Sequence, residues 1–133
     1  GLLLENPYFL TQYTGYQNLK LLASIKNKIG DEDIVHALER VGLEAADKRK
    51  VRKYSLGMKQ RLGIAAAIME EPDILLLDEP FNAIDEGGLQ LIRDILADFK
   101  KAGRIVILAC HDKEELESVS DEIIKMKNGK IEV

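Results

Sequence analysis

Cysteine is almost missing from this sequence of 133 residues, since Cys110 is the only one. One cysteine excludes a disulfide framework within the chain and argues against a thiolate metal site, as expected in a reducing compartment such as the cytosol. No uninterrupted apolar run approaches the roughly 20 residues that a membrane-spanning helix needs. We therefore expect a cytosolic chain that does not itself cross a membrane.

A strong excess of positive charge is missing too. The 23 acidic and 19 basic residues give a formal net charge of −4 and are mixed along the chain, so no basic face and no nucleic-acid partner are predicted. Without internal repeats or Pro/Ser-rich linkers, and with 46% hydrophobic residues, the composition is typical of one globular domain. Gly1–Leu4 lacks the charged start of a signal peptide and is typical of a strand already under way, so we expect a missing segment before it.

Three helices are predicted in the first half of the chain. Apolar residues recur at helical spacing over residues 15–28. Asp31 is the predicted N-cap of a second helix, which Gly42 ends in a left-handed conformation. Ser55 is the predicted N-cap of a third helix, which runs to about Met69. The first half is therefore expected to be entirely helical.

The spacing of the apolar residues changes in the second half. Ile74–Leu77 is a short continuous apolar run, which is typical of a strand buried on both faces of a parallel sheet. Asp85 is the predicted N-cap of a long helix that Gly103 ends. Asn128-Gly129 is the preferred two-residue turn of a β-hairpin. The other predicted elements are a strand at Arg104–Ala109, a helix at Glu114–Val119 and hairpin strands at Glu122–Met126 and Lys130–Val133. This alternation predicts an α/β fold with a parallel sheet covered by helices.

Two short patterns carry chemistry. Asp78 and Glu79 follow the apolar strand directly, and ligands bind at the carboxyl ends of strands in open α/β sheets. One carboxylate can hold Mg²⁺ while the next polarises a water for attack on a phosphoryl group; the alternative is two solvated acids in a turn. Ser55 and Gly57 open a helix whose free N–H groups could bind an anion, or Ser55 could be a plain helix cap.

Taken together and in order, these patterns resemble the ATPase domain of ABC transporters over the whole chain. Tyr54–Arg61 is similar to the signature motif, Ile74–Pro80 to Walker B with its catalytic glutamate, Asn82–Asp85 to the D-loop, and His111 to the switch histidine. The resemblance implies a partial P-loop NTPase-like parallel sheet with an inserted ABC α-helical subdomain. It implies one incomplete domain over 1–133, with a Q-loop-equivalent strand and loop at about 1–15, the helical subdomain at about 16–71 and the second half of the catalytic core at about 72–133.

The same resemblance implies roles for individual residues, with ATP and Mg²⁺ as cofactors. Asp78 would organise the Mg²⁺, Glu79 would be the general base for the attacking water, and His111 would contact the γ-phosphate. Ser55 and Gly57 would bind ATP held by a second ATPase subunit. Asp85 would lie at that dimer interface, and its role as a helix N-cap is equally compatible with the sequence. The other partner would be a transmembrane permease subunit, which would keep the protein at the inner face of the membrane.

Two motifs depart from the common family pattern, the signature at Tyr54, Leu56 and Met58 and the Q-loop at Glu5. Met58 stands where the signature has a glutamine, and Glu5 stands where the Q-loop has one, which resembles lantibiotic-immunity and bacitracin-export subunits. Glu5 could ligate Mg²⁺ or position water near the nucleotide, or it could be a strand-end acid without a role. Residues 8–18 would then contact the permease, with Tyr8 and Phe9 either as exposed anchors or as core residues.

A third departure is that no G-x-x-x-x-G-K-[ST] sequence occurs in the chain. Without this phosphate-binding loop we expect the chain alone to bind ATP weakly and to hydrolyse none, whereas its intact parent would be an ATPase. We also expect an exposed sheet edge, because the strand before that loop is missing. Export of a peptide antibiotic or drug is the function that the resemblance favours. The alternatives are an ABC-type ATPase unconnected with transport and a non-enzymatic interaction module.

Overall fold

The computed structural model describes residues 1–132 and confirms the three helices expected in the first half, but this half is not entirely helical, because Leu2–Leu3 is a strand. Its helices are α1 (Gly15–Lys26), α2 (Asp31–Arg40), the 3₁₀ helix η1 (Val51–Lys53) and α3 (Leu56–Ile68). Ser55 caps α3 as expected, since its hydroxyl accepts a hydrogen bond from the Met58 amide at 3.1 Å. Gly42 has the expected left-handed backbone, with φ of 73°.

The N-cap predicted for α2 is wrong. Gly30, and not Asp31, is the cap, and Asp31 is the first residue of the helix. The reason is that the Asp33 carboxylate accepts a hydrogen bond from the Gly30 amide at 2.9 Å, which fixes the turn one residue earlier. Asp31 instead forms an exposed ion pair with Lys20 at 3.3 Å.

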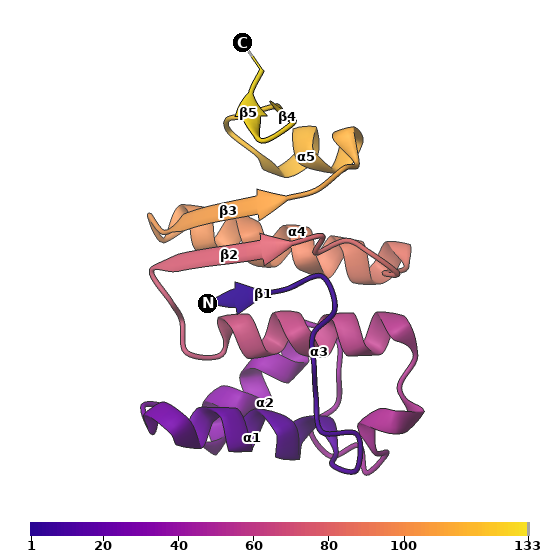
Figure 1. Cartoon of the computed structure of the whole chain (residues 1–133). Helices are drawn as coiled ribbons and strands as arrows, with labels where there is room; N and C mark the ends of the chain where they lie inside the picture. Colours follow the sequence, from indigo (N-terminus) through magenta and orange to yellow (C-terminus); the bar gives the residue numbers. More distant parts are fainter. Residues whose placement is uncertain (133) are drawn as a thin grey trace.

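The second half is an α/β layer, as the alternating pattern predicts. It consists of β2 (Ile74–Asp78), α4 (Glu86–Lys101), β3 (Ile105–Ala109) and α5 (Lys113–Val119), and β1 (Leu2–Leu3) joins it from the start of the chain. The strand order is β1-β2-β3, and both pairings are parallel. Figure 1 shows all three arrows pointing the same way, with α4 behind β2 and β3 and the helical half beyond β1.

The predicted hairpin is present, but it is short and separate from the parallel sheet. It consists of β4 (Met126–Lys127) and β5 (Lys130–Ile131), which form a two-stranded antiparallel sheet of their own. Asn128 and Gly129 both have positive φ, 51° and 73°, as the preferred hairpin turn requires. Residues 122–125 are not a strand, and Val133, included in the prediction, lies outside the described residues.

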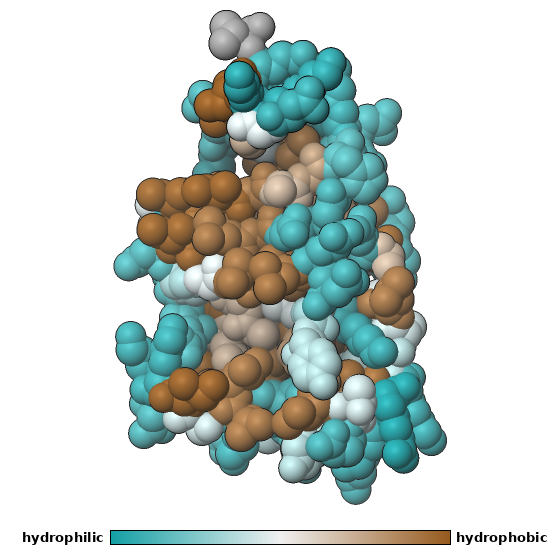
Figure 2. All heavy atoms as spheres, in the orientation of Figure 1, coloured by the Kyte–Doolittle hydropathy of each residue, from teal (hydrophilic) through white to brown (hydrophobic). Residues whose placement is uncertain are grey.

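The two faces of the parallel sheet differ in burial. Leu3, Leu75 and Leu77 are almost fully buried, and their cover comes from α3, which packs on β1, and α4, which packs on β3. The alternate side chains on the opposite face are 41–58% exposed: Leu2, Ile74, Leu76, Ile105 and Ile107. Figure 2 shows this face as a hydrophobic area over β2 and β3.

The expectation that Ile74–Leu77 is buried on both faces is therefore wrong for residues 1–132. The apolar character of the run is right, but within these residues only one face of the strand is covered by helices. Both outer strands, β1 and β3, have an unpaired edge in this part of the chain, in agreement with the expected exposed sheet edge. No helix within residues 1–132 has the length and apolar character needed to cross a membrane.

Candidate functional site

Parallel pairing brings three chain segments to one edge of the sheet. The register sets Leu3 beside Leu77 and Asp78 beside Ala109, so the residues that follow β1, β2 and β3 leave the sheet at the same end. Glu5, Glu79 and His111 are those residues. Side chains that are far apart in sequence, with Glu5 more than 70 residues before Glu79, are thereby placed at the carboxyl ends of adjacent strands, where open α/β sheets bind ligands.

Glu79 has an unusual backbone conformation. Its φ is 49°, a left-handed value that costs a non-glycine residue roughly 1 kcal/mol or more and persists only when the surroundings impose it. Two hydrogen bonds impose it here. The Glu79 amide donates to the Ala109 carbonyl at 2.8 Å, and the Glu79 carbonyl accepts from Nε2 of Gln60 at 2.8 Å. Its peptide groups are thus fixed to β3 on one side and to α3 on the other.

The side chain of Glu79 faces His111. Nδ1 of His111 lies 2.9 Å from both carboxylate oxygens, while the carboxylate is only 18% exposed and the imidazole is 78% exposed. This hydrogen bond and the charge of Glu79 raise the pKa of His111 above its ordinary value, and Asp112 and Glu5 raise it further. A carboxylate has about four lone-pair positions, so each oxygen can still accept a hydrogen bond from a water molecule.

Asp78 is the half-buried last residue of β2. Among residues 1–132, no group of three or more His, Cys, Asp or Glu side chains could hold a metal ion. Mg²⁺ is usually bound by one or two carboxylates together with phosphate oxygens and water, and not by a cage of protein ligands. Asp78 and Glu5 are carboxylates at this end of the sheet that could take part in such a site.

Ser55 and Gly57 lie at the start of α3. A Cβ atom added to Gly57 would come within 2.5 Å of the Ala83 carbonyl oxygen, so the loop after Glu79 packs directly on this helix end and requires glycine there. Ser55 is exposed and acts as the helix cap, and no hydrogen bond joins it to Glu79 or His111. The structure thus separates the two predicted groups: one contains Glu79, His111 and Asp78, and the other is the N-terminal end of α3.

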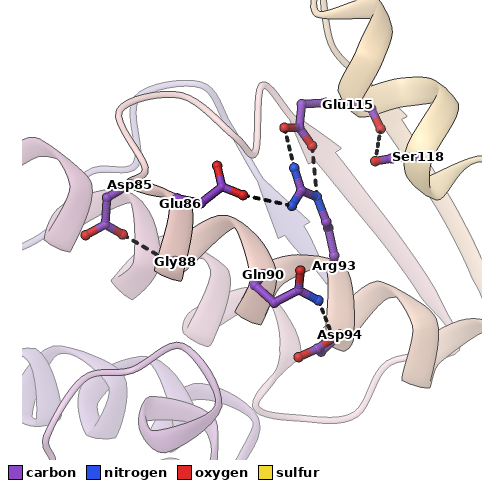
Figure 3. A network of polar contacts seen from close by, with 8 residues as sticks. All are labelled: Asp85, Glu86, Gly88, Gln90, Arg93, Asp94, Glu115 and Ser118. Carbon is purple, nitrogen blue, oxygen red and sulfur yellow. Dashed lines mark hydrogen bonds and ion pairs between the residues drawn. The ribbon is translucent and has the colours of Figure 1, made fainter.

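Asp85 caps α4, because its Oδ1 accepts a hydrogen bond from the Gly88 amide at 2.9 Å (Figure 3). Further along α4, Arg93 donates two hydrogen bonds to Glu115, at 2.7 and 3.2 Å. This pair fixes α5 to α4, and α5 begins two residues after His111. Sequence reasoning missed the pair because its two residues lie on different helices.

Tyr8 and Phe9 differ in exposure, which separates the two alternatives predicted for them, exposed anchor and core residue. Tyr8 is 89% exposed, and Phe9 is 8% exposed and part of the core. Phe9 as an exposed anchor is therefore wrong.

Gln60 lies within the signature-like segment and has no predicted role. Its side chain is one of the two buried polar side chains in residues 1–132, and the other is Asn18. A polar residue on an otherwise apolar helix face was the only sequence signal for it.

Comparison with known proteins gives consistent matches. The family model described as "ABC transporter" matches residues 1–82. An uncharacterized ABC transporter ATP-binding protein of Bacillus subtilis, YybJ, is 51% identical over 132 residues, which cover 99% of this chain and 61% of the relative. The bacitracin transport ATP-binding protein BcrA of Enterococcus faecalis is 42% identical over 130 residues, 97% of this chain and 42% of the relative. The lantibiotic transport ATP-binding protein SrtF of Streptococcus pyogenes is 37% identical over 131 residues, which cover 98% of this chain and 57% of the relative.

This chain spans less than two thirds of the length of each of these relatives. Two solved structures have the same fold. One is a post-hydrolysis dimer of an ATP-binding cassette bound to ADP and Pi, with a TM-score of 0.83 and 23% identity. The other is a dimeric bacterial ABC transporter cassette, with a TM-score of 0.82 and 24% identity. Each match covers 98% of this chain and 60% of the solved chain.

Proposed function

This chain belongs to the ABC transporter family, and from that premise we propose that it is part of an ATP-binding subunit that hydrolyses ATP and couples hydrolysis to export. The observation that carries the proposal is the contact between Glu79 and His111 at the carboxyl ends of β2 and β3. At this end of the sheet, the carboxylate is suited to act as a base for an attacking water, and the imidazole is suited to act as a cationic partner for phosphate.

Glu79 is the proposed general base. Its carboxylate is mostly shielded from solvent but keeps lone pairs free for water. The raised pKa of His111 favours its protonated form, which would attract the γ-phosphate of a bound nucleotide. Asp78 is the proposed Mg²⁺ residue, with Glu5 in support; when bound, the ion would neutralise charge that develops on the phosphate oxygens.

Ser55, Gly57 and the start of α3 are proposed to meet a nucleotide held by a second ATPase subunit. The helix end is exposed at Ser55, and its dipole favours an anion. Asp85 would lie close to the same dimer interface, since Gly57 packs on the loop that leads to it. Hydrolysis at two such sites would depend on closure of the dimer.

A transmembrane permease is the other proposed partner, and it would hold the subunit at the cytoplasmic face of a membrane. Tyr8 is the proposed contact, because its ring is almost fully exposed beside a buried neighbour and exposed aromatic side chains often anchor interfaces. Export of a peptide antibiotic is proposed as the transport function. Two relatives named for bacitracin and lantibiotic transport support it.

Calorimetric titration with Mg-ATP tests the proposal. The chain would be compared with a version extended upstream by a strand and a G-x-x-x-x-G-K-[ST] loop taken from a relative that carries them. We expect no measurable binding by the chain alone, because the loop supplies the main phosphate contacts. The extended protein should bind ATP and release phosphate, and Glu79→Gln should retain binding while slowing release about 10²- to 10⁴-fold.

Glu117→Gln is the matched control, because Glu117 is an exposed glutamate on α5 whose one ion pair within residues 1–132 is with Lys113. It should leave phosphate release unchanged. Tight ATP binding by the chain alone would contradict the role given to the missing loop. An extended protein that neither binds nor hydrolyses ATP would overturn the proposed function.

A further inference from the structure

Gln60 connects α3 to the backbone of Glu79. Its side chain is 4% exposed, and its Nε2 donates to the Glu79 carbonyl across 19 residues of sequence. Burial of an amide is unfavourable unless a hydrogen bond compensates it. The amide of Gln60 makes this bond to the one residue of the site whose backbone is left-handed.

The other buried polar side chain provides a comparison. Asn18 is also 4% exposed, but all its hydrogen bonds are local: it bonds to the amide and carbonyl of Leu10 and to the carbonyl of Thr14. Asn18 therefore organises the loop before α1. Gln60 fixes a distant segment, and that segment carries the proposed catalytic base.

We propose that Gln60 is a positioning residue for Glu79: its hydrogen bond to the Glu79 carbonyl fixes the left-handed backbone that directs the carboxylate toward His111. The Glu79 amide is fixed separately by Ala109. Loss of the Gln60 bond would leave the peptide group between Glu79 and Pro80 without its partner, free to rotate about a backbone conformation that is unfavourable by itself.

This inference rests on the proposed function and extends it to regulation. Gln60 lies on the same helix as Ser55 and Gly57, and a helix moves as a rigid unit over so few residues. A nucleotide that binds the start of α3 would therefore displace the residue that holds the glutamate of the neighbouring site. Gly57 supports the same coupling, because its close packing on Ala83 joins the helix to the loop after Glu79. The two sites of a dimer would communicate through α3.

The test uses the chain as it is and needs no nucleotide. NMR would follow two quantities in the native sequence and in Gln60→Met: the titration of the His111 ring and the ¹³C shift of the Glu79 carbonyl. Methionine is similar in volume but cannot donate. We expect the carbonyl shift to change to that of an unbonded group and the His111 titration midpoint to move down, because the carboxylate is no longer directed at the ring.

Asn18→Leu is the matched control, since it removes the hydrogen bonds of the other buried amide and should destabilise the chain without moving the His111 midpoint. If Gln60→Met does not fold, Gln60→Leu also removes the donor and adds no charge near His111. The inference is overturned if a folded Gln60 variant keeps the native midpoint, or if Asn18→Leu moves it equally. Neither outcome involves ATP, so failure here is distinct from failure of the calorimetric test.

Discussion

The contact between His111 and Glu79 joins residues that are 32 positions apart in sequence and come from the ends of two neighbouring strands. Its energy depends on the protonation of the imidazole, because a cation beside a carboxylate gains more than a neutral ring does. The pKa of His111 is raised in the folded chain. The strength of the pair therefore changes with pH as the imidazole titrates.

We predict that Glu79→Gln lowers the pKa of His111 toward the ordinary histidine range. A raised pKa means that the ion pair contributes to stability at pH values below the ordinary histidine pKa, and that this contribution is lost as the pH rises through the folded-state pKa. Since the imidazole is 78% exposed, solvent screens the pair and the contribution to unfolding is small. NMR titration of the ring is the suitable measurement. A His111 midpoint equal in both proteins would contradict the observed contact.

The residues of this site could be predicted from sequence to different degrees. Asp78, Glu79 and His111 could be placed at one end of the sheet, because Asp78 and Glu79 directly follow the apolar run Ile74–Leu77, His111 comes two residues after the strand at Arg104–Ala109, and parallel strands end together. Gln60 could not be placed there, because its contact with Glu79 depends on how α3 packs in three dimensions. The burial of Phe9 beside an exposed Tyr8 could not be predicted either. Both residues lie in an irregular segment, which has no periodicity to indicate which side chains are buried.

At the scale of elements, α4 offers a clear test of capping. Asp85→Ala removes the carboxylate that accepts from the Gly88 amide, and we expect the free energy of unfolding to fall by about 1 kcal/mol. Asp85→Asn is the control, because asparagine caps helices about as well as aspartate. Urea denaturation measures both. An asparagine variant as unstable as the alanine variant would show that the charge of Asp85, and not its cap, is what matters.

Helix caps and turns are predicted correctly where the residue type alone identifies them. Ser55 and Asp85 were predicted caps and are the caps observed, and Asn128-Gly129 forms the predicted turn. Asp31 is not the cap because Asp33, two residues later, accepts a hydrogen bond from the Gly30 amide, and residue type alone does not distinguish the two aspartates. The hairpin strands are shorter than predicted, since the two apolar residues of 122–125, Ile123 and Ile124, are adjacent and lack the alternation that is typical of a strand.

At the scale of the whole molecule, the uncovered face of the parallel sheet forms an exposed hydrophobic area over β2 and β3 (Figure 2). Exposed apolar areas such as this sheet face bind hydrophobic dyes and promote association. We predict that the chain increases the fluorescence of ANS and that Ile107→Lys reduces the increase, because Ile107 is 58% exposed on this face. Ile131→Lys is the control, since Ile131 is equally exposed but belongs to the separate hairpin. Equal losses from both variants would argue against a dye site on the sheet.

The pairing of β1 with β2 has a consequence for the time course of folding. Gly1 and Ile74, which are hydrogen-bonded, lie 73 residues apart, so their pairing closes a long loop, whereas helices form from near neighbours within about a microsecond. A strand of two residues forms few contacts, which offset little of the entropy lost when the loop closes. We expect the helical half to form early and β1 to dock late. Glu5 would then reach Glu79 and His111 only in the final step, and the edge that carries the chemistry would be the last part of the molecule to assemble.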